Sequence, residues 1–213
     1  QVLVSDSGNI PEHFRNELIS NQIEFEERGH TLSKFEDASL VIKSPGIPEN
    51  ASVVRQLREQ GKEIISEIEF AYRYKGESRI IGITGSNGKT TTTTMIFQML
   101  KAEGLDVAEV GNIGYSFARQ IAVDPKKYYV AEISSFQLDD INTFRPDIAV
   151  LTNITEDHLD RYDHRMENYV RSKFNILKYQ NEDDLFIYNL DDEETMKNLD
   201  KYLNNVKAFP ISM

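Results

Sequence analysis

The sequence predicts an α/β protein with two domains, each built around a mostly parallel sheet. Short apolar runs, such as Val2–Val4, Leu40–Ile42 and Arg79–Thr84, alternate with longer polar stretches of helical pattern. Strands that alternate with helices form parallel sheets that helices cover on both faces. A length of 213 residues allows one large domain or two small ones, and the polar stretch Lys75–Ser78 favours two. We therefore expect domains at residues 1–76 and 77–213.

Turn and helix-end residues delimit the elements of the first domain. Pro11 suits the first turn of a helix, and Gly61 suits the end of one, where the backbone needs a positive φ. The run Ser44-Pro45-Gly46-Ile47-Pro48 is a turn, because its prolines cannot continue a strand. The expected strands are residues 2–4, 40–42 and 64–65, and the expected helices are residues 11–21, 51–60 and 67–74.

The second domain repeats the alternation on a larger scale. Its first strand runs directly into a glycine-rich turn and a helix. The expected strands are residues 79–84, a short one near Val107, and residues 129–133, 148–151, 185–188 and 206–209, and the clearest helices are residues 88–103, 167–178 and 192–203. No capping element follows the last strand, so we expect this domain to be cut short.

Composition and charge exclude several classes of protein. The absence of cysteine excludes a disulfide framework, a zinc ribbon and a cysteine nucleophile. No apolar run approaches the roughly 18 residues of a membrane span, and the N-terminus lacks the basic and apolar regions of a signal peptide. A net charge of −11 disfavours a nucleic-acid partner held through its phosphates. Since Gln1 already lies in a strand-like run, we expect the sequence to be a fragment.

The strongest functional signal is the loop Gly85-Ser86-Asn87-Gly88-Lys89-Thr90-Thr91 between a strand and a helix. Glycines let the backbone wrap around phosphates, and the N–H groups and the helix N-terminus attract the anion. Lys89 is expected to reach the β- and γ-phosphates of a nucleoside triphosphate, and Thr90 to hold Mg²⁺.

The match to the phosphate-loop pattern G-x-x-x-x-G-K-[ST] is imperfect, because Ile83 occupies the first glycine position. The alternative is a glycine-rich turn with a surface lysine, which the order of strand, turn, Lys-Thr and helix disfavours. By itself the loop is compatible with a kinase, a motor ATPase, a GTPase or an ATP-dependent ligase.

Acidic residues accompany the carboxyl ends of two later strands. Glu132 lies in an otherwise apolar strand, and Glu156-Asp157-His158-Leu159-Asp160 follows the next one. Open α/β sheets bind ligands at the carboxyl ends of their strands, and carboxylates there can hold Mg²⁺. We therefore interpret Glu132 and His158 as metal ligands. The alternatives are a strand glutamate that faces water and an acidic cluster that caps a helix.

Four motifs, in this order, resemble the Mur ligases of peptidoglycan synthesis. They are T-G-S-N-G-K-T-T at 84–91, G-N-I-G at 111–114, E-I-S-S-F-Q-L at 132–138 and N-I-T-E-D-H-L-D-R-Y at 153–162. The S-S-F-Q-L element and the S-P-G-I-P turn at 44–48 are most similar to family members that add D-glutamate to UDP-N-acetylmuramoyl-L-alanine. The resemblance covers nearly the whole chain.

The resemblance implies a protein of three domains, of which this sequence holds parts of two. The first is a small Rossmann-like domain that binds the uridine nucleotide, and its first strand and glycine-rich loop are expected to precede Gln1. The second is a P-loop-type, ATP-binding central domain, expected to be truncated at Met213. The C-terminal domain, which binds the amino acid, is expected to be absent, so the fragment alone is not expected to catalyse the full reaction.

The resemblance also assigns roles to individual residues. Catalytic roles fall on Lys89, His158 and Lys173, and the family carbamylates the last of these with CO₂. The implied ATP contacts are Gly85, Asn87, Gly88, Lys89, Thr90 and Thr91. The implied ligands of two Mg²⁺ ions are Thr90, Glu132, His158 and Lys173. The implied substrate contacts are Asp6, Ser7, Ser44, Pro45, Gly46, Asn112 and Gln137. Without the resemblance, Lys173 is a lysine on a helix, and such lysines are usually solvated.

The implied activity is ATP-dependent amide ligation. The γ-phosphate of ATP passes to the alanine carboxylate of UDP-N-acetylmuramoyl-L-alanine, and the amine of D-glutamate attacks the resulting acyl phosphate. The implied setting is the cytoplasm, in cell-wall synthesis and hence in cell shape, the cell cycle and cell division. We expect a monomer with no nucleic-acid partner and no membrane insertion.

Three rival functions stay open. A different Mur-type ligase or a folylpolyglutamate synthetase shares the loop but carries other residues after the strand glutamate. A non-catalytic nucleotide-binding module is compatible with a missing domain. A P-loop motor or nucleic-acid ATPase fits the loop, but neither the charge of −11 nor the acidic cluster.

Overall fold

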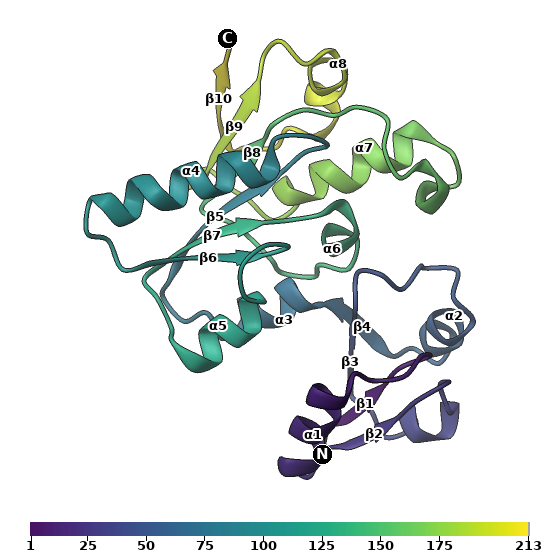
Figure 1. Ribbon diagram of the computed structural model, residues 1–213. Helices are drawn as coiled ribbons and strands as arrows, with labels where there is room; N and C mark the ends of the chain where they lie inside the picture. Colours follow the sequence, from purple (N-terminus) through teal and green to yellow (C-terminus); the bar gives the residue numbers. More distant parts are fainter. Residues whose placement is uncertain (213) are drawn as a thin grey trace. The chain divides into compact units, whose positions relative to one another are not determined.

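A computed structural model describes residues 1–212 of the chain, which divide into two compact units (Figure 1). The first unit contains residues 1–41 and 48–64, and the second contains residues 42–47 and the chain from Ile65 onward. Helix α3 (Glu67–Tyr74) belongs to the second unit because Ile68 and Ala71 lie in its core. The division at residue 76 expected for the functional domains stays a prediction.

The first unit is small. Strands β1 (Leu3–Ser5) and β2 (Glu24–Glu26) pair in parallel, and α1 (Glu12–Ser20) connects them. The short 3-10 helix η1 (Leu32–Phe35) follows, and α2 (Ser52–Glu59) buries Val54 and Leu57. Strands β3 (Leu40–Lys43) and β4 (Glu63–Ser66) form a second two-stranded sheet and lead the chain into the second unit. Gly61 has a φ of 72°, which confirms the predicted helix end.

A six-stranded parallel sheet forms the centre of the second unit, in the order β10-β9-β8-β5-β7-β6 (Figure 1). The strands are β5 (Arg79–Thr84), β6 (Val107–Gly111), β7 (Tyr128–Glu132), β8 (Ile148–Leu151), β9 (Leu185–Asn189) and β10 (Lys207–Ile211). β5 pairs with β7 on one side and with β8 on the other. The chain crosses from β5 to β6 on the β7 side, and later crosses from β7 to β8 in the opposite direction. Such a switch point creates a ligand crevice at the carboxyl ends of the strands.

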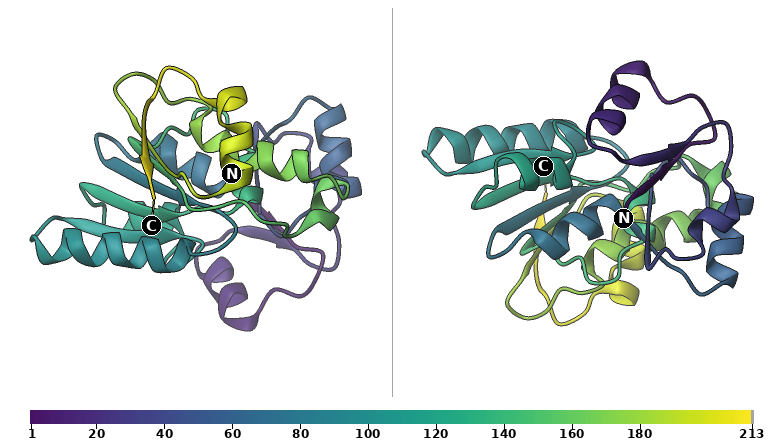
Figure 2. Two further views of the ribbon diagram at one scale, coloured as in Figure 1. Left: turned by 90° about the horizontal axis from the view of Figure 1, so that it is seen from above. Right: turned by 90° about the horizontal axis from the view of Figure 1, so that it is seen from below.

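Helices cover both faces of this sheet, with α4 (Lys89–Ala102) on one side and α7 (Met166–Phe174) and α8 (Glu193–Tyr202) on the other (Figure 2). Neighbouring side chains of a strand point to opposite faces. Ile83 therefore packs under α4 with Val130 and Val150, whereas Ile80 joins the larger core of the opposite face. The remaining helices are α5 (Phe117–Val123), α6 (Ser135–Asp139), η2 (Leu159–Tyr162) and η3 (Asn175–Leu177).

The α/β class and the parallel sheet are confirmed, and most element boundaries lie within two residues of the prediction. The helix expected at 167–178 is α-helical only to Phe174, because its last turn tightens into η3. The strand β2 and the short helices α5 and α6 had no clear periodic signal, since each spans too few residues to show one. Within residues 1–212, no helix has the length and apolar character needed to span a membrane.

Candidate nucleotide and substrate site

The glycine-rich segment between β5 and α4 forms a tight loop at the carboxyl end of the sheet. Gly85 has a φ of 147°, and a Cβ there would lie 1.9 Å from Thr152 Oγ1, so a side chain does not fit. Gly88 is the N-cap of α4 with a left-handed φ of 81°, which glycine adopts without strain. Ile83 is a fully buried residue of β5. The loop thus needs glycine at positions 85 and 88, and a glycine at position 83 is not required.

Two lysines converge on one carbonyl oxygen of this loop. Lys89 Nζ donates hydrogen bonds to Gly85 O and Ser86 O, both at 2.9 Å. Lys173 Nζ donates to the same Gly85 O at 2.7 Å. Lys173 lies on α7, is only 2% exposed, and its Nζ lies 5.0 Å from the centre of the Tyr169 ring.

Burial, with the charge of Lys89 as a further cause, lowers the pKa of Lys173 to about 7. A large fraction of this amine is therefore neutral near pH 7, and only a neutral amine is nucleophilic. The prediction of a solvated lysine, made from the residues without the resemblance, is wrong. A signal for burial was present, because Tyr169, Val170, Lys173 and Phe174 recur with helical spacing on one buried face.

The expected metal ligands Thr90 and Glu132 are in direct contact. Thr90 Oγ1 donates to Glu132 Oε2 at 2.7 Å, and Asn112 Nδ2 donates to Glu132 Oε1 at 2.9 Å. A hydroxyl and a carboxylate are the hard oxygen donors that Mg²⁺ prefers, so these residues fit the ion. Within residues 1–212, no group of three or more His, Asp or Glu side chains could hold a metal. Water or phosphate oxygens would therefore have to complete its coordination.

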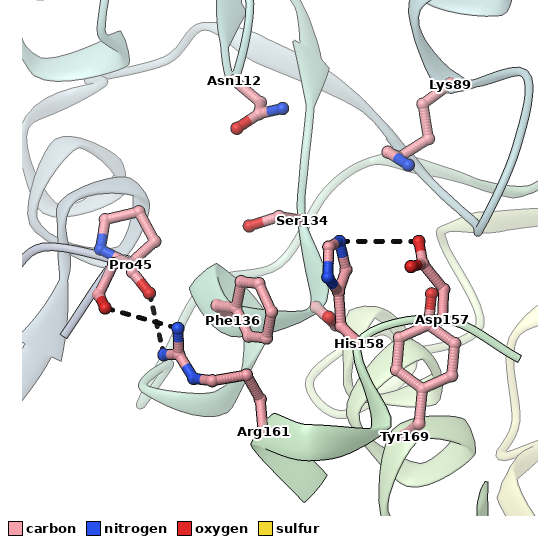
Figure 3. Close-up of a pocket in the computed structure, with 11 residues that line it drawn as sticks. Pro45, Lys89, Asn112, Ser134, Phe136, Asp157, His158, Arg161 and Tyr169 are labelled. Atoms are coloured by element: carbon pink, nitrogen blue, oxygen red, sulfur yellow. Dashed lines mark hydrogen bonds and ion pairs between the residues drawn. The ribbon is translucent and has the colours of Figure 1, made fainter. Parts of the chain in front are cut away.

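A cavity of about 300 Å³ opens beside the loop (Figure 3). It is lined by Pro45, Gly46, Lys89, Asn112, Ser134, Ser135, Phe136, Asp157, His158, Arg161 and Tyr169. Lys89 and His158 project into the same space from opposite sides (Figure 3). His158 is exposed, and its Nε2 lies 3.5 Å from Asp157 Oδ2. Most of the lining residues have polar side chains, and the cationic Lys89 and Arg161 are among them, as an anionic ligand requires.

One wall of the cavity is held by Arg161. Its guanidinium donates to Pro45 O at 3.1 Å and to Gly46 O at 3.3 Å (Figure 3). The same group lies 4.4 Å from the centre of the Phe136 ring. Lys43, just before the turn, forms a buried ion pair with Asp140 at 2.8 Å. This part of the chain is therefore held at two points, by Arg161 and by the ion pair of Lys43.

The remaining expected site residues lie elsewhere. Asp6 and Ser7 belong to the first unit, where Asp6 Oδ1 accepts a hydrogen bond from Gly8 N at 2.7 Å. Ser44 closes the turn through its carbonyl, which accepts from Ile47 N. Gln137 is buried and does not line the cavity. Its Oε1 accepts from Ser134 N at 2.9 Å and completes the capping box of α6.

The two outer positions of the loop motif are open to solvent. Asn87 lies at the loop tip and Thr91 in the first turn of α4, and both are exposed.

The residues that line the cavity but were not predicted are Ser134, Ser135, Phe136, Asp157, Arg161 and Tyr169. All except Tyr169 lie inside the motifs that carry the family resemblance, so the motifs mark the cavity more completely than the selected residues do.

Residues 83–212 match the family of the Mur ligase middle domain, and residues 1–53 match that of the MurD N-terminal domain. The first match alone spans more than half of the chain, and this chain belongs to the Mur ligase family.

Its relatives point to one branch of that family. A UDP-N-acetylmuramoylalanine–D-glutamate ligase from Bacteroides fragilis is 50% identical over 209 residues, which are 98% of this chain and 47% of that protein. The ligase of the same name from Christiangramia forsetii is 47% identical over 212 residues, covering 100% of this chain and 47% of its own length. The chain thus spans about half the length of the curated relatives it matches.

Solved structures of other Mur ligases share the fold. A UDP-N-acetylmuramate:L-alanyl-gamma-D-glutamyl-meso-diaminopimelate ligase from Neisseria meningitides has a TM-score of 0.64 at 20% identity, over 97% of this chain and 69% of that one. A MurF ligase from Thermotoga maritima in complex with ADP has a TM-score of 0.55 at 19% identity, over 85% and 49% of the two chains. At these identities the likeness extends to the fold alone.

Proposed function

We propose that this chain forms the nucleotide site and part of the substrate site of an ATP-dependent ligase that joins D-glutamate to UDP-N-acetylmuramoyl-L-alanine. One observation carries the proposal. Lys89, Lys173 and the Thr90–Glu132 pair lie around the glycine loop, and the cavity of about 300 Å³ opens beside it. The 50% identity to a ligase of that name supports the choice of substrate.

The proposed chemistry requires activation of a carboxylate. Bound ATP supplies the γ-phosphoryl group that converts the alanine carboxylate into an acyl phosphate, which the amine of D-glutamate attacks with release of phosphate. Lys89 and the N-terminus of α4 offset the repulsion between the triphosphate and the carboxylate. Asn112 and Ser134 line the cavity where they can orient the muramoyl substrate. The protein acts mainly by positioning and by charge neutralisation.

Two Mg²⁺ ions belong to this proposal. Thr90 and Glu132 would hold one, and His158 with Lys173 would support the other. Mg²⁺ supplies positive charge at the phosphates. Lys173 would act as a carbamate: the nitrogen of its neutral amine forms a bond to the carbon of CO₂ and loses one proton, and the product is a carboxylate-like anion. The lowered pKa of Lys173 supports this step because the neutral amine is present near pH 7.

The rest of the proposal concerns the whole protein. Asp6, Ser7, Ser44, Pro45 and Gly46 would contact the uridine diphosphate part of the substrate. The enzyme would act as a monomer in the cytoplasm, in the synthesis of peptidoglycan precursors. Cell-wall growth, cell shape and division would depend on it.

The test measures phosphate release by a protein that contains this chain and has the full length of its relatives. We expect release only when ATP, UDP-N-acetylmuramoyl-L-alanine and D-glutamate are all present. Release with another amino acid in place of D-glutamate would instead identify a different Mur-type ligase. Release with a folate acceptor would identify a folylpolyglutamate synthetase. Nucleotide binding without any release would leave only a binding module.

A further inference from the structure

The tip of the phosphate loop is held by a side chain from a neighbouring strand end. Asn153 lies two residues beyond β8, and its amide group faces the backbone of Asn87. Asn153 Oδ1 accepts from Asn87 N at 3.0 Å, and Asn153 Nδ2 donates to Asn87 O at 3.0 Å. The primary amide thus pairs with both backbone groups of one loop residue, as a neighbouring strand would.

The surrounding contacts reinforce this pairing. Thr152 Oγ1 donates to Asn87 O at 2.7 Å, and Ser86 N donates to the carbonyl of Asn153 at 2.9 Å. Asn87 is itself exposed, so these bonds and not burial fix its conformation. The loop therefore receives its shape at residue 87 from the segment after β8.

The pairing determines where two peptide groups of the loop point. In a planar trans peptide the C=O and the following N–H point in opposite directions. Because Asn87 O faces Thr152 and Asn153, the N–H of Gly88 points away from them, at the N-terminus of α4. Because Asn87 N–H faces Asn153, the carbonyl of Ser86 points the other way, and there it accepts from Lys89 Nζ at 2.9 Å.

We propose that Asn153 is a positioning residue of the nucleotide site: by pairing with Asn87 it turns the Gly88 N–H toward the phosphates and the Ser86 carbonyl toward Lys89. The inference rests on the proposed binding of a nucleoside triphosphate at this loop. The pairing uses both the oxygen and the nitrogen of the amide. An aspartate keeps the acceptor for Asn87 N–H but places a second oxygen against Asn87 O, and that repulsion favours a flipped peptide.

The test compares Asn153→Asp with the wild-type full chain, using calorimetric titration with the Mg²⁺ complex of AMP-PNP. We expect at least tenfold weaker binding and a midpoint of thermal unfolding close to that of wild type. The matched control is Asn198→Asp on α8, where the amide also donates to a backbone carbonyl, Glu194 O, at 2.9 Å. This control introduces the same charge away from the loop, and we expect its affinity to stay within twofold of wild type.

A spectroscopic readout separates positioning from a general loss of structure. In ¹⁵N-resolved spectra of the wild type, we expect the Gly88 amide resonance to move on addition of the nucleotide. In the Asn153→Asp variant we expect that shift to be absent or much smaller, whereas amides of the sheet keep their positions. The neutral variant Asn153→Ala serves as a second test, and we expect an affinity between those of wild type and Asn153→Asp.

The outcomes distinguish the inference from the function on which it rests. If wild type binds AMP-PNP and both Asn153 variants bind within twofold of it, Asn153 has no positioning role and the nucleotide site stands. If wild type shows no binding even at millimolar nucleotide, the proposed site is wrong for this chain and the inference falls with it. If Asn153→Asp is unfolded, the Asn153→Ala variant decides by the same criterion.

Discussion

Lys89 is the single side chain on which nucleotide binding is expected to depend most. Its Nζ is held at 2.9 Å from both Gly85 O and Ser86 O, so the cation is already anchored inside the loop. We predict that Lys89→Ala weakens binding of the Mg²⁺–AMP-PNP complex at least tenfold, because a charge-assisted contact to phosphate is lost. Calorimetric titration measures this. Lys101→Ala, on the exposed end of the same helix, is the control and is expected to bind normally. Equal affinities for the two variants would rule out a phosphate contact by Lys89.

Lys173 offers a second prediction at the residue scale, because burial and the charge of Lys89 keep its pKa near 7. We predict that incubation with ¹³C-labelled bicarbonate gives a carbamate signal in ¹³C spectra, since neutral amines react with CO₂. The signal should be absent in Lys173→Ala and unchanged in Lys178→Ala, whose lysine is exposed just after the same helix segment. A signal that survives in Lys173→Ala would place the carbamate elsewhere. In the full-length enzyme, short carboxylates should partly restore the activity that Lys173→Ala loses.

Among the elements, α3 depends on one buried carboxylate for its attachment to the core. Glu69 accepts hydrogen bonds from Asn142 N, Thr143 N and Phe144 N at 2.7 to 3.0 Å, and from Thr143 Oγ1 at 2.6 Å. Burial alone would raise the pKa of Glu69, but the hydrogen bonds from Thr143 and Asn142 outweigh it and the pKa is lowered. The carboxylate thus joins α3 to the segment between α6 and β8.

We predict that Glu69→Ala lowers the free energy of unfolding by on the order of 3 kcal/mol at pH 7, because buried N–H groups lose their acceptor. The folded-state pKa lies below the ordinary value of 4.5, so the carboxylate stabilises the fold fully above that value. The difference between wild type and variant should shrink as the pH falls below about 4.5, through the lowered pKa. Urea unfolding at pH 7 and pH 4 measures it, with Glu77→Ala at an exposed position as the control. A difference that is the same at both pH values would contradict a role for the charged form.

Some elements and contacts could be predicted from the sequence, and others could not. β5 and α4 were predictable because an apolar run, two glycines and a Lys-Thr pair are local signals. The contact between Arg161 and Pro45 was not, since 116 residues separate them and only the folded chain brings them together. The role of Gln137 was missed although its signal is local: Ser134 and Gln137 have the spacing of a capping box.

At the scale of the whole molecule, the two units have very different cores. The buried apolar side chains of the first unit are few: Ile10, Val54, Leu57 and Ile64. The second unit buries a large cluster on one face of its sheet and a smaller one under α4. Stability is not uniform when compact units differ this much, and the smaller unit is expected to open at a lower free energy.

A matched pair of leucines tests this difference. Leu57 in the first unit and Leu177 in the second are 2% and 1% exposed, and truncation of either to alanine should cost about 2–5 kcal/mol. We predict that Leu57→Ala accelerates amide hydrogen exchange within residues 1–41 and 48–64 and leaves AMP-PNP affinity within twofold of wild type. Leu177→Ala should accelerate exchange in the six-stranded sheet and weaken AMP-PNP binding, because the phosphate loop is built on β5 and α4. If Leu57→Ala weakened nucleotide binding as much as Leu177→Ala does, the two units would unfold as one cooperative body, and the nucleotide site would depend on both.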